Sequence, residues 1–269
     1  MIDFTSGQLV GWVMSIFWPF VRLLAFVSTA PLFGENMVPR RIKIALAALL
    51  AFVIAPTLGP IPDVPPLSIA GVWLVVQQVM IGAALGLVMR LAFGVVQSTG
   101  EFIGMQMGLG FASFYSAALG ANTMVLGQLL NTFAMLLFLA FNGHLILLDI
   151  LARSFTLLPI GVDELHGDGW WLAARTGGIL FTAGVSLALP LIATLLTINM
   201  AMGILNRASP QLSIFSIGFP MTLLAGLVVI TFLIPDLGAF LHRLFDTLFE
   251  RMLSVVGALA GRSTPDALP

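Results

Sequence analysis

The sequence predicts an all-α, polytopic membrane protein built of kinked helical hairpins. The first reason is composition: of 269 residues, 59% are hydrophobic and 9% are charged, and the mean hydropathy is +1.08. Soluble globular domains carry roughly a quarter of charged residues. The second reason is a series of apolar runs long enough to cross a bilayer core. The third is that prolines fall inside three of these runs, at Pro19, Pro190 and Pro220, where each removes a backbone hydrogen bond and tends to bend its helix.

Six apolar runs have about the length that spans a bilayer core at the rise of an α-helix. They cover residues 9–32, 44–61, 69–96, 125–150, 177–204 and 213–235. Five prolines within 56–66 predict an extended loop between the second and third runs, because proline lacks an amide donor and fixes φ. A polar loop at 161–169 precedes the last two runs, and we expect a boundary between two subregions at 153–175.

The first loop holds the densest positive cluster of the chain, formed by Arg40, Arg41 and Lys43. The positive-inside rule favours a cytoplasmic position for this loop. Lys43 is the only lysine and the net charge is -1, which argues against nucleic-acid binding by a basic surface. A phosphate-binding loop of the Walker type is excluded as well, because its lysine is missing from the glycine-rich segments.

Enzymatic chemistry has no basis in the sequence. The chain has no cysteine, and its three histidines lack the spacing of metal ligands. Neither paired carboxylates nor a serine, histidine and aspartate pattern is present. We therefore expect a protein that is not an enzyme and that uses no metal or other cofactor.

The segment from Gly100 to Gly127 is apolar enough for a membrane but too rich in glycine for an ordinary spanning helix, and we interpret it as the working part of the chain. Small residues spaced by multiples of four let two helices approach closely. They form one row at Gly82, Gly86, Gly94 and Ser98, with Arg90 between them, and a second row at Gly100, Gly104 and Gly108. Both rows predict tight contact between helices.

Bulky and deformable side chains accompany these glycines, at Met105, Met107, Phe111, Phe114 and Tyr115. Methionine adapts its shape and aromatic rings fill a lumen, so the group is suited to a plug that closes a pore against ions. Core packing is the alternative interpretation, and the residues alone leave both open.

Charged residues inside apolar runs require partners, because burial at mid-membrane costs about 2.5–3.5 kcal/mol each on the insertion scale. His144 and Asp149 are five positions apart and do not share a helix face, so a proton relay is not indicated. We expect Arg22, Glu101 and Asp149 to form ion pairs with partner subunits.

The last two runs are joined by a polar turn, which predicts a helical hairpin. Pro210 ends the preceding helix, while Asn206, Arg207 and Gln211 make the turn polar. These groups either anchor the turn at the surface or contact another subunit.

After Pro235 the apolar residues recur at helical spacing, at Leu237, Leu241, Leu244, Leu248 and Met252. The opposite side carries His242, Arg243, Asp246 and Glu250. This pattern predicts an amphipathic helix within 241–269 that lies at an interface, contacts a partner or caps the bundle, followed by a loose tail from Gly261 to Pro269.

Three blocks of sequence, in order along the chain, carry a resemblance to a known family. The first is Pro31-Leu32-Phe33-Gly34 with Val38-Pro39-Arg40-Arg41-Ile42-Lys43; the second is GMQMGLGFA at 104–112; the third is NRASPQLSIF at 206–215. Together they resemble the FliR family, the membrane export-gate component of flagellar type III secretion. The virulence-type homologues SctT and SpaR share the implied fold, and the block at 38–43 favours the flagellar branch.

The resemblance implies a helical hetero-oligomeric export gate in the bacterial inner membrane, at the flagellar basal body. In it, one copy of this subunit assembles with several copies of FliP and FliQ, together with FlhB and FlhA, and unfolded flagellar proteins pass through. It also implies a FliP-like region at 1–175, a FliQ-like hairpin at 176–240, and hairpins largely lifted out of the bilayer plane, so that the six runs need not be six spans.

The same resemblance places a plug loop at 104–120, with Phe111 and Phe114 at the aromatic positions. The sequence departs from the family pattern after the second aromatic residue. Many members have an Asp-Pro pair there, whereas Tyr115 is followed here by Ser116-Ala117-Ala118. The alternatives from other classes are a secondary transporter for a small solute, which inverted repeats would support, and a structural scaffold without contact to a lumen.

Overall fold

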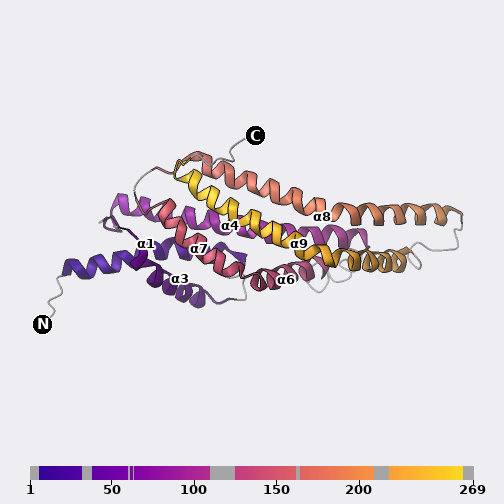
Figure 1. The fold of residues 1–269 in the computed structure, drawn as a ribbon, viewed down its shortest axis with the longest axis horizontal. Coiled ribbons are helices and arrows are strands. Elements are labelled where there is room, and N and C mark those ends of the chain that lie inside the picture. The colour runs from indigo at the N-terminus through magenta and orange to yellow at the C-terminus, as the bar shows by residue number, and fades with distance from the viewer. Residues whose placement is uncertain are drawn as a thin grey trace. The chain divides into compact units, whose positions relative to one another are not determined.

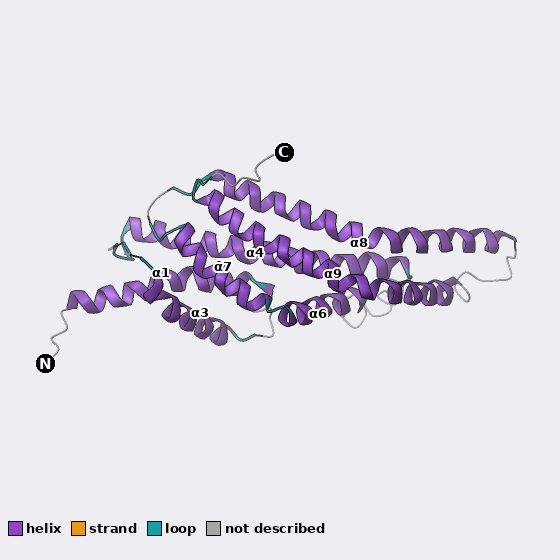
Figure 2. Ribbon diagram, in the orientation of Figure 1, coloured by secondary structure: helices purple, strands orange, loops and turns teal. Residues whose placement is uncertain are grey.

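The computed structural model describes residues 6–31, 38–59, 61–62, 64–109, 125–161, 164–208 and 218–262. Within these ranges every regular element is a helix, and Figure 2 shows helices and loops only. The helices, labelled in Figure 1, are α1 (Ser6–Thr29), α3 (Arg40–Ile54), the 3-10 turn η1 (Ala55–Thr57), α4 (Ile69–Gln106), α6 (Val125–Ala140), α7 (Gly143–Leu157), α8 (Gly167–Ala208) and α9 (Phe219–Leu259). The predicted all-α class is confirmed.

Within the described ranges, three helices are long and apolar enough to cross a membrane, and the number rises to five if each of two bent helix pairs is counted as one span. The three single helices are Gly11–Thr29, Ile69–Gln106 and Gly167–Leu205. The chain is therefore a polytopic membrane protein, although its six apolar runs do not correspond to six straight spans.

Two sharp bends interrupt the predicted pattern of runs. The run at 125–150 is not one helix, because α6 and α7 meet at an angle of 71°. Asn142 adopts a left-handed conformation with φ of 56° between them, which a continuing α-helix cannot accommodate. The run at 213–235 and the amphipathic helix that follows it are both part of α9, which bends by 60° between its segments Pro220–Phe232 and Ile234–Leu259.

The prolines act differently from the prediction. Pro19 and Pro190 lie inside α1 and α8, which continue through them, and Pro220 is the second residue of α9. The predicted kink at Pro220 is wrong, because the first amides of a helix have no intrahelical acceptor and proline is tolerated there. Pro235 follows directly on the bend of α9, where its ring excludes the regular hydrogen bond to the preceding turn.

The chain divides into two compact units. Unit 1 comprises Met1–Leu91, Asn142–Gly177 and Thr247–Pro269; unit 2 comprises Ala92–Phe141 and Gly178–Asp246. In unit 1, α4 approaches α1 so closely that a Cβ added at Gly82 would overlap the carbonyl oxygen of Arg22, and one at Gly86 would overlap Thr29. The absence of a side chain at Gly82 and Gly86 therefore permits the close spacing of α1 and α4.

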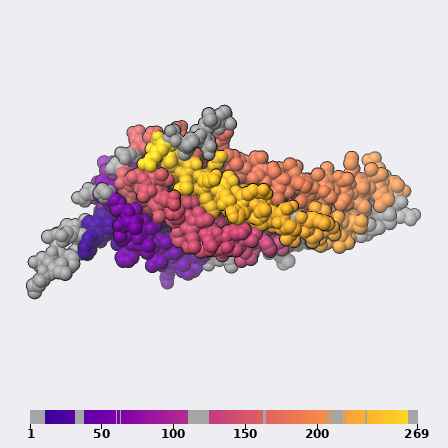
Figure 3. All heavy atoms as spheres, in the orientation of Figure 1, coloured from indigo at the N-terminus to yellow at the C-terminus, as the bar shows by residue number. Residues whose placement is uncertain are grey.

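Helix α3 packs against α1 in unit 1 and leaves several of its large side chains exposed. Ala47 and Ala51 are buried, whereas Leu49, Phe52 and Val53 are 62–67% exposed. The atoms of α3 accordingly lie at the surface in Figure 3. The helix has 15 residues and is shorter than the hydrocarbon core requires.

The core of unit 2 is formed by α4 and α8, through the buried side chains Ile103, Met107, Ala188, Leu191 and Leu195. A cluster of Phe93, Phe138 and Phe245 joins α4, α6 and α9, with ring centroids 5.1–5.7 Å apart. Edge-to-face contacts of this kind add to the free energy of burial.

The amphipathic pattern at the end of α9 is confirmed. The apolar residues of the pattern are all buried within the chain, and the four polar residues opposite them are exposed. The apolar side is thus covered by the chain's own helices, as expected for a segment that caps the bundle. The division into a FliP-like region and a FliQ-like hairpin concerns likeness to other proteins and stays a prediction.

Candidate functional site: the glycine-rich end of α4

The glycine-rich segment begins as a helix, because α4 continues through Gly100 and Gly104 to Gln106. At Gly100 it meets α6 backbone to backbone: an added Cβ would lie 2.7 Å from the Cα of Gly127 and 2.9 Å from the carbonyl oxygen of Leu126. A Cβ at Gly127 would in turn lie 2.8 Å from the carbonyl oxygen of Gln97. Such distances leave no room for a side chain, so α4 and α6 are in closest contact at these two glycines.

The helix ends in a Schellman motif. Gly108 has φ of 80°, its amide donates to the carbonyl of Met105, and the amide of Leu109 donates to the carbonyl of Gly104. Positive φ favours glycine, because a Cβ clashes with the backbone in this conformation. Gly108 therefore stops α4 at a defined residue.

Two other helices of unit 2 hold the end of α4. Carbonyls in the last turn of a helix lack intrahelical donors. The side-chain amide of Asn199 on α8 donates to the carbonyl of Gln106 at 3.4 Å, and the hydroxyl of Thr222 on α9 donates to the carbonyl of Met107 at 3.3 Å. The side chain of Met107 is buried and fills the space next to Gly226.

The residues on either side of the segment 110–124, Leu109 and Leu126, both lie next to Gly104. A Cβ added at Gly104 would lie 3.6 Å from the Cβ of Leu126 and 3.7 Å from the Cδ1 of Leu109. The chain thus leaves α4 and enters α6 at one packed base. Phe111, Phe114 and Tyr115 lie outside the described residues. Of the two methionines in the predicted plug, Met105 is 48% exposed, whereas Met107 belongs to the core of unit 2.

The two rows of small residues have unequal surroundings. Gly82, Gly86 and Gly100 are buried against backbone or a short side chain, as described above. Gly94 is exposed and has no atom within 4 Å of an added Cβ, and Arg90 in the same row is exposed too. Close contact with a neighbouring helix therefore occurs at Gly82 and Gly86 in the first row and at Gly100 in the second.

The charged residues that we expected to pair with other subunits have partners within the chain. Arg22 is fully buried and bonds to side chains and carbonyls of unit 1. Asp149 forms an exposed ion pair of 2.8 Å with Arg153, one helical turn away on α7. The side-chain amide of Gln97 donates to Glu101 at 3.0 Å. All three residues thus have a contact inside the chain, and the expected ion pairs with other subunits stay a prediction.

The remaining candidate contact residues lie at helix ends. Arg40 and Arg41 are exposed in the first turn of α3, where Lys43 is half-buried. Asn206 and Arg207 belong to the last turn of α8, and Arg207 is exposed. Pro210 and Gln211 lie outside the described residues. Asn199 and Thr222 were missed by the sequence reasoning, because nothing in their spacing relates them to α4.

No group of three metal-ligating side chains occurs in the part of the chain that the structure describes. The arrangement is one of packing and hydrogen bonding on both sides of the segment 110–124.

Comparison with known proteins identifies the family. Residues 13–248 match the family described as "Bacterial export proteins, family 1". The chain is 46% identical to the flagellar biosynthetic protein FliR of Pectobacterium carotovorum over 97% of this chain and 99% of that protein. It is 45% identical to FliR of Escherichia coli K12, over 96% and 99%, and 29% identical to FliR of Bacillus subtilis 168, over 91% and 95%. An export family agrees with the prediction that the chain is not an enzyme. The chain therefore belongs to family 1 of the bacterial export proteins, the family of the flagellar biosynthetic protein FliR.

Proposed function

We propose that the chain is a core subunit of the flagellar type III protein export gate, and that it forms, with FliP and FliQ, the pore through which unfolded flagellar proteins leave the cytoplasm. The plug loop within 104–120 keeps this pore closed in the inner membrane at the flagellar basal body. Energy for export comes from other components. Family membership supports the role in export, and the flagellar name of the relatives favours the flagellar branch over the virulence-type branch.

The observation that carries the plug is the packed base at the end of α4. A closing element must keep its place while its tip yields to a passing chain. Both ends of the segment 110–124 are restrained. Where the chain leaves α4, it is held by the Schellman motif at Gly108 and by the hydrogen bonds from Asn199 and Thr222. Where it enters α6, Leu126 packs next to Gly104. Phe111 and Phe114 supply the apolar rings that a barrier to ions requires.

Exposed apolar surface supports assembly with other subunits. In the most apolar stretch of α4, 61% of the residues are buried within the chain, whereas the corresponding stretch of α8 is only 28% buried. The outer side of α8 carries the exposed side chains Leu189, Leu196, Met200 and Ile204. In a membrane such a surface faces lipid or another helix, and we assign it to neighbouring gate subunits. FlhB and FlhA are the further partners, and the turn at Asn206–Gln211 together with Arg40, Arg41 and Lys43 are candidate contacts.

The plug is tested by replacing Phe111 and Phe114 together with alanine in the assembled complex. Loss of both rings is expected to let small ions through, because neither the backbone nor alanine fills the volume of an aromatic ring. The measurement is the conductance of planar bilayers or the ion leak of vesicles that contain the complex. Phe133→Ala is the matched control, since Phe133 is an exposed aromatic residue of α6 outside the segment.

Unchanged conductance in the double variant, with the complex intact, would remove the plug from the proposal. Equal leakage in Phe133→Ala would show general loosening of the helices instead of an opened plug. A secondary transporter for a small solute was the alternative from another class. Membership of an export family gives it no support.

A further inference from the structure

Arg22 is the one arginine among the fully buried side chains of the described residues, and it lies inside a candidate membrane span. Its Nε donates to Oε1 of Gln78 on α4 at 2.8 Å. Nη1 donates to the carbonyl of Ser154 at 3.0 Å and contacts the Ser154 hydroxyl at 3.3 Å, while Nη2 donates to the carbonyl of Leu158 at 3.0 Å. The guanidinium carbon lies 4.2 Å from the centre of the Phe155 ring. One side chain of α1 thus connects α4 with the end of α7.

The charge of Arg22 is balanced without a carboxylate. Neither of the ion pairs found among the described residues involves it. Its two backbone acceptors instead belong to the C-terminal end of α7, where free carbonyls carry the negative end of the helix dipole. The planar guanidinium presents several donors in a fixed arrangement, so it can bind two carbonyls and an amide at once, which an ammonium group cannot reproduce.

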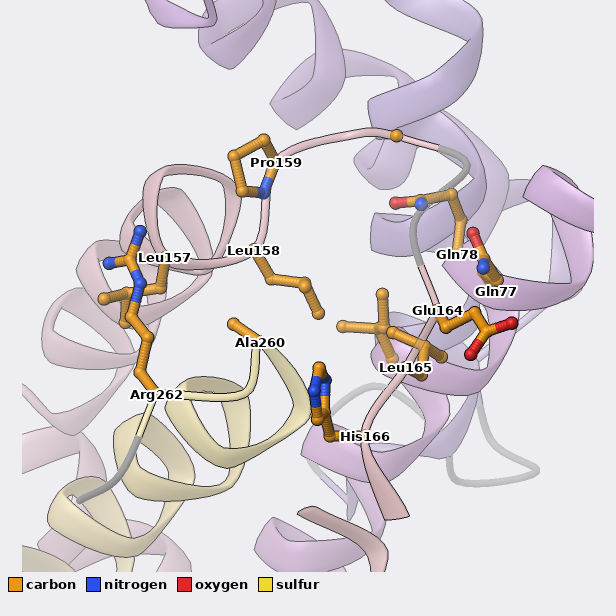
Figure 4. A pocket seen from close by; sticks show the side chains of 12 residues that line it. Gln77, Gln78, Leu157, Leu158, Pro159, Glu164, Leu165, His166, Ala260 and Arg262 are labelled. Atoms are coloured by element: carbon orange, nitrogen blue, oxygen red, sulfur yellow. The ribbon is translucent and has the colours of Figure 1, made fainter. Parts of the chain in front are cut away.

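The segment that Arg22 holds, Leu158–Gly161, lies between two cavities of unit 1. One cavity, of about 280 Å³, is lined by Gln78, Leu158, Pro159 and Gly161, together with Leu165 and His166. Figure 4 shows Leu158 pointing into it toward Leu165 and His166. The other, of about 380 Å³, is lined by Leu58, Gly59 and Ile61 of the proline-rich loop and by Phe155, Thr156, Pro159 and Ile160.

Packing alone restrains this segment weakly. Pro159 lines both cavities, and of the four residues only Ile160 is buried. Well-packed segments of a protein interior have few voids larger than a water molecule beside them. A segment with open volume on both sides depends on its hydrogen bonds to keep its position. The bond that Nη2 of Arg22 donates to the carbonyl of Leu158 comes from a fully buried group.

We propose that Arg22 is a latch, which holds the C-terminal end of α7 and the segment Leu158–Gly161 in the position seen here. When the latch is weakened, the segment moves into the flanking volume. The inference rests on the contacts of unit 1 and is independent of the plug.

The experiment uses an introduced cysteine as a reporter in the full-length chain, in the membranes of the bacterium that produces it. The chain has no native cysteine, so within this chain an added maleimide reacts only with the introduced thiol, and the label is counted on the chain after its purification. Ile160→Cys places the thiol at the buried residue of the segment, and Leu147→Cys places it in the buried part of α7 away from the segment. The rate of labelling measures how often each position opens.

Two substitutions change the latch in opposite directions. Arg22→Lys keeps the charge but loses the fork, and we expect it to raise the labelling rate at residue 160 by about tenfold or more, because each hydrogen bond to a charged group supports the closed position by at least such a factor. Gln78→Glu supplies a carboxylate to Arg22 without a change of size, and we expect it to lower the rate by about threefold or more. Arg90→Lys, an exposed arginine of α4 in the same unit, is the control and leaves the rate unchanged.

The latch is contradicted if Arg22→Lys changes the labelling rate at residue 160 by less than about twofold. It is also contradicted if Arg22→Lys raises the labelling rate at residue 147 by the same factor, because equal opening at both positions means that unit 1 unfolds as a whole. If Arg22→Lys does not accumulate in the membrane, Gln78→Glu decides. Slower labelling at residue 160 supports the latch, and an unchanged or faster rate contradicts it.

Discussion

The same substitution, glycine to alanine, is predicted to have opposite effects at two positions of α4. At Gly100 an added Cβ would lie 2.7 Å from Cα and 3.0 Å from N of Gly127, and at Gly94 it would meet nothing within 4 Å. Both glycines lie inside the helix, so alanine gains about 1 kcal/mol of helix propensity at either one. The two positions therefore differ in packing alone.

At Gly100 the contacting atoms belong to the backbone of α6, which cannot turn away as a side chain can. Overpacking of this kind costs about 1–3 kcal/mol, and contact with rigid backbone places the cost at the upper end. After the gain in propensity, Gly100→Ala should lower the free energy of unfolding by about 1–2 kcal/mol, whereas Gly94→Ala should raise it by about 1 kcal/mol.

The assay is thermal unfolding of the tagged, full-length chain within its purified complex in detergent, followed by the fraction of the tagged chain that stays in solution at each temperature. One kcal/mol corresponds to roughly 2–4 °C in a chain of about this size. We expect a lower melting temperature for Gly100→Ala and a higher one for Gly94→Ala. A higher melting temperature for Gly100→Ala, or shifts of the same sign and size at both positions, would refute the close contact of α4 with α6.

Two further predictions concern helix ends and charges. Gly108→Ala should lower the free energy of unfolding by about 1–2 kcal/mol, because alanine is strained at the φ of 80°, and Gly108→Asn should lower it by less. Thermal unfolding of the two variants beside the parent chain checks this. If both variants are as stable as the parent, the Schellman motif is contradicted. Asp149→Asn should change the free energy of unfolding by less than about 1 kcal/mol, because Asp149 and Arg153 are both more than half exposed. A larger loss in the same unfolding assay would mean that Asp149 has a partner beyond α7.

The parts of the fold that the sequence predicted are those set by local pattern. The apolar runs mark the helices, because hydropathy over about 20 residues is a local property. The spacing of Leu237, Leu241 and Leu244 identified the buried side of α9, because positions three and four apart share a helix face. Polar residues on the opposite side fixed the exposed face in the same way.

The bends of the helices were harder to predict. A bend depends on the backbone conformation of one or two residues, and the neighbouring sequence allows that conformation without requiring it. Kinks were expected at Pro19, Pro190 and Pro220, yet Pro220 lies in the first turn of α9 and the bend of α9 lies beside Pro235. The bend of 71° at Asn142 involves no proline. Asparagine tolerates the left-handed conformation, but its sequence context gives no sign that it will adopt it.

The interior contacts could not be predicted at all from one sequence. Arg22 was expected to need a partner subunit, whereas its acceptors lie 56 to 136 positions away in the same chain. Likewise, the spacing of the small residues treats Gly86 and Gly94 alike, and only the neighbouring helix distinguishes them. Such contacts arise from tertiary packing, which spacing within one helix does not contain.

The central claim is that this chain works as one subunit among unlike neighbours. The most direct measurement is purification of the tagged, full-length chain from the membranes of the bacterium that produces it, followed by the mass of the intact complex and the identity of its members. We predict a complex in which the chain is joined by FliP and FliQ in unequal copy number. A folded chain that isolates alone, or only with copies of itself, would contradict the account.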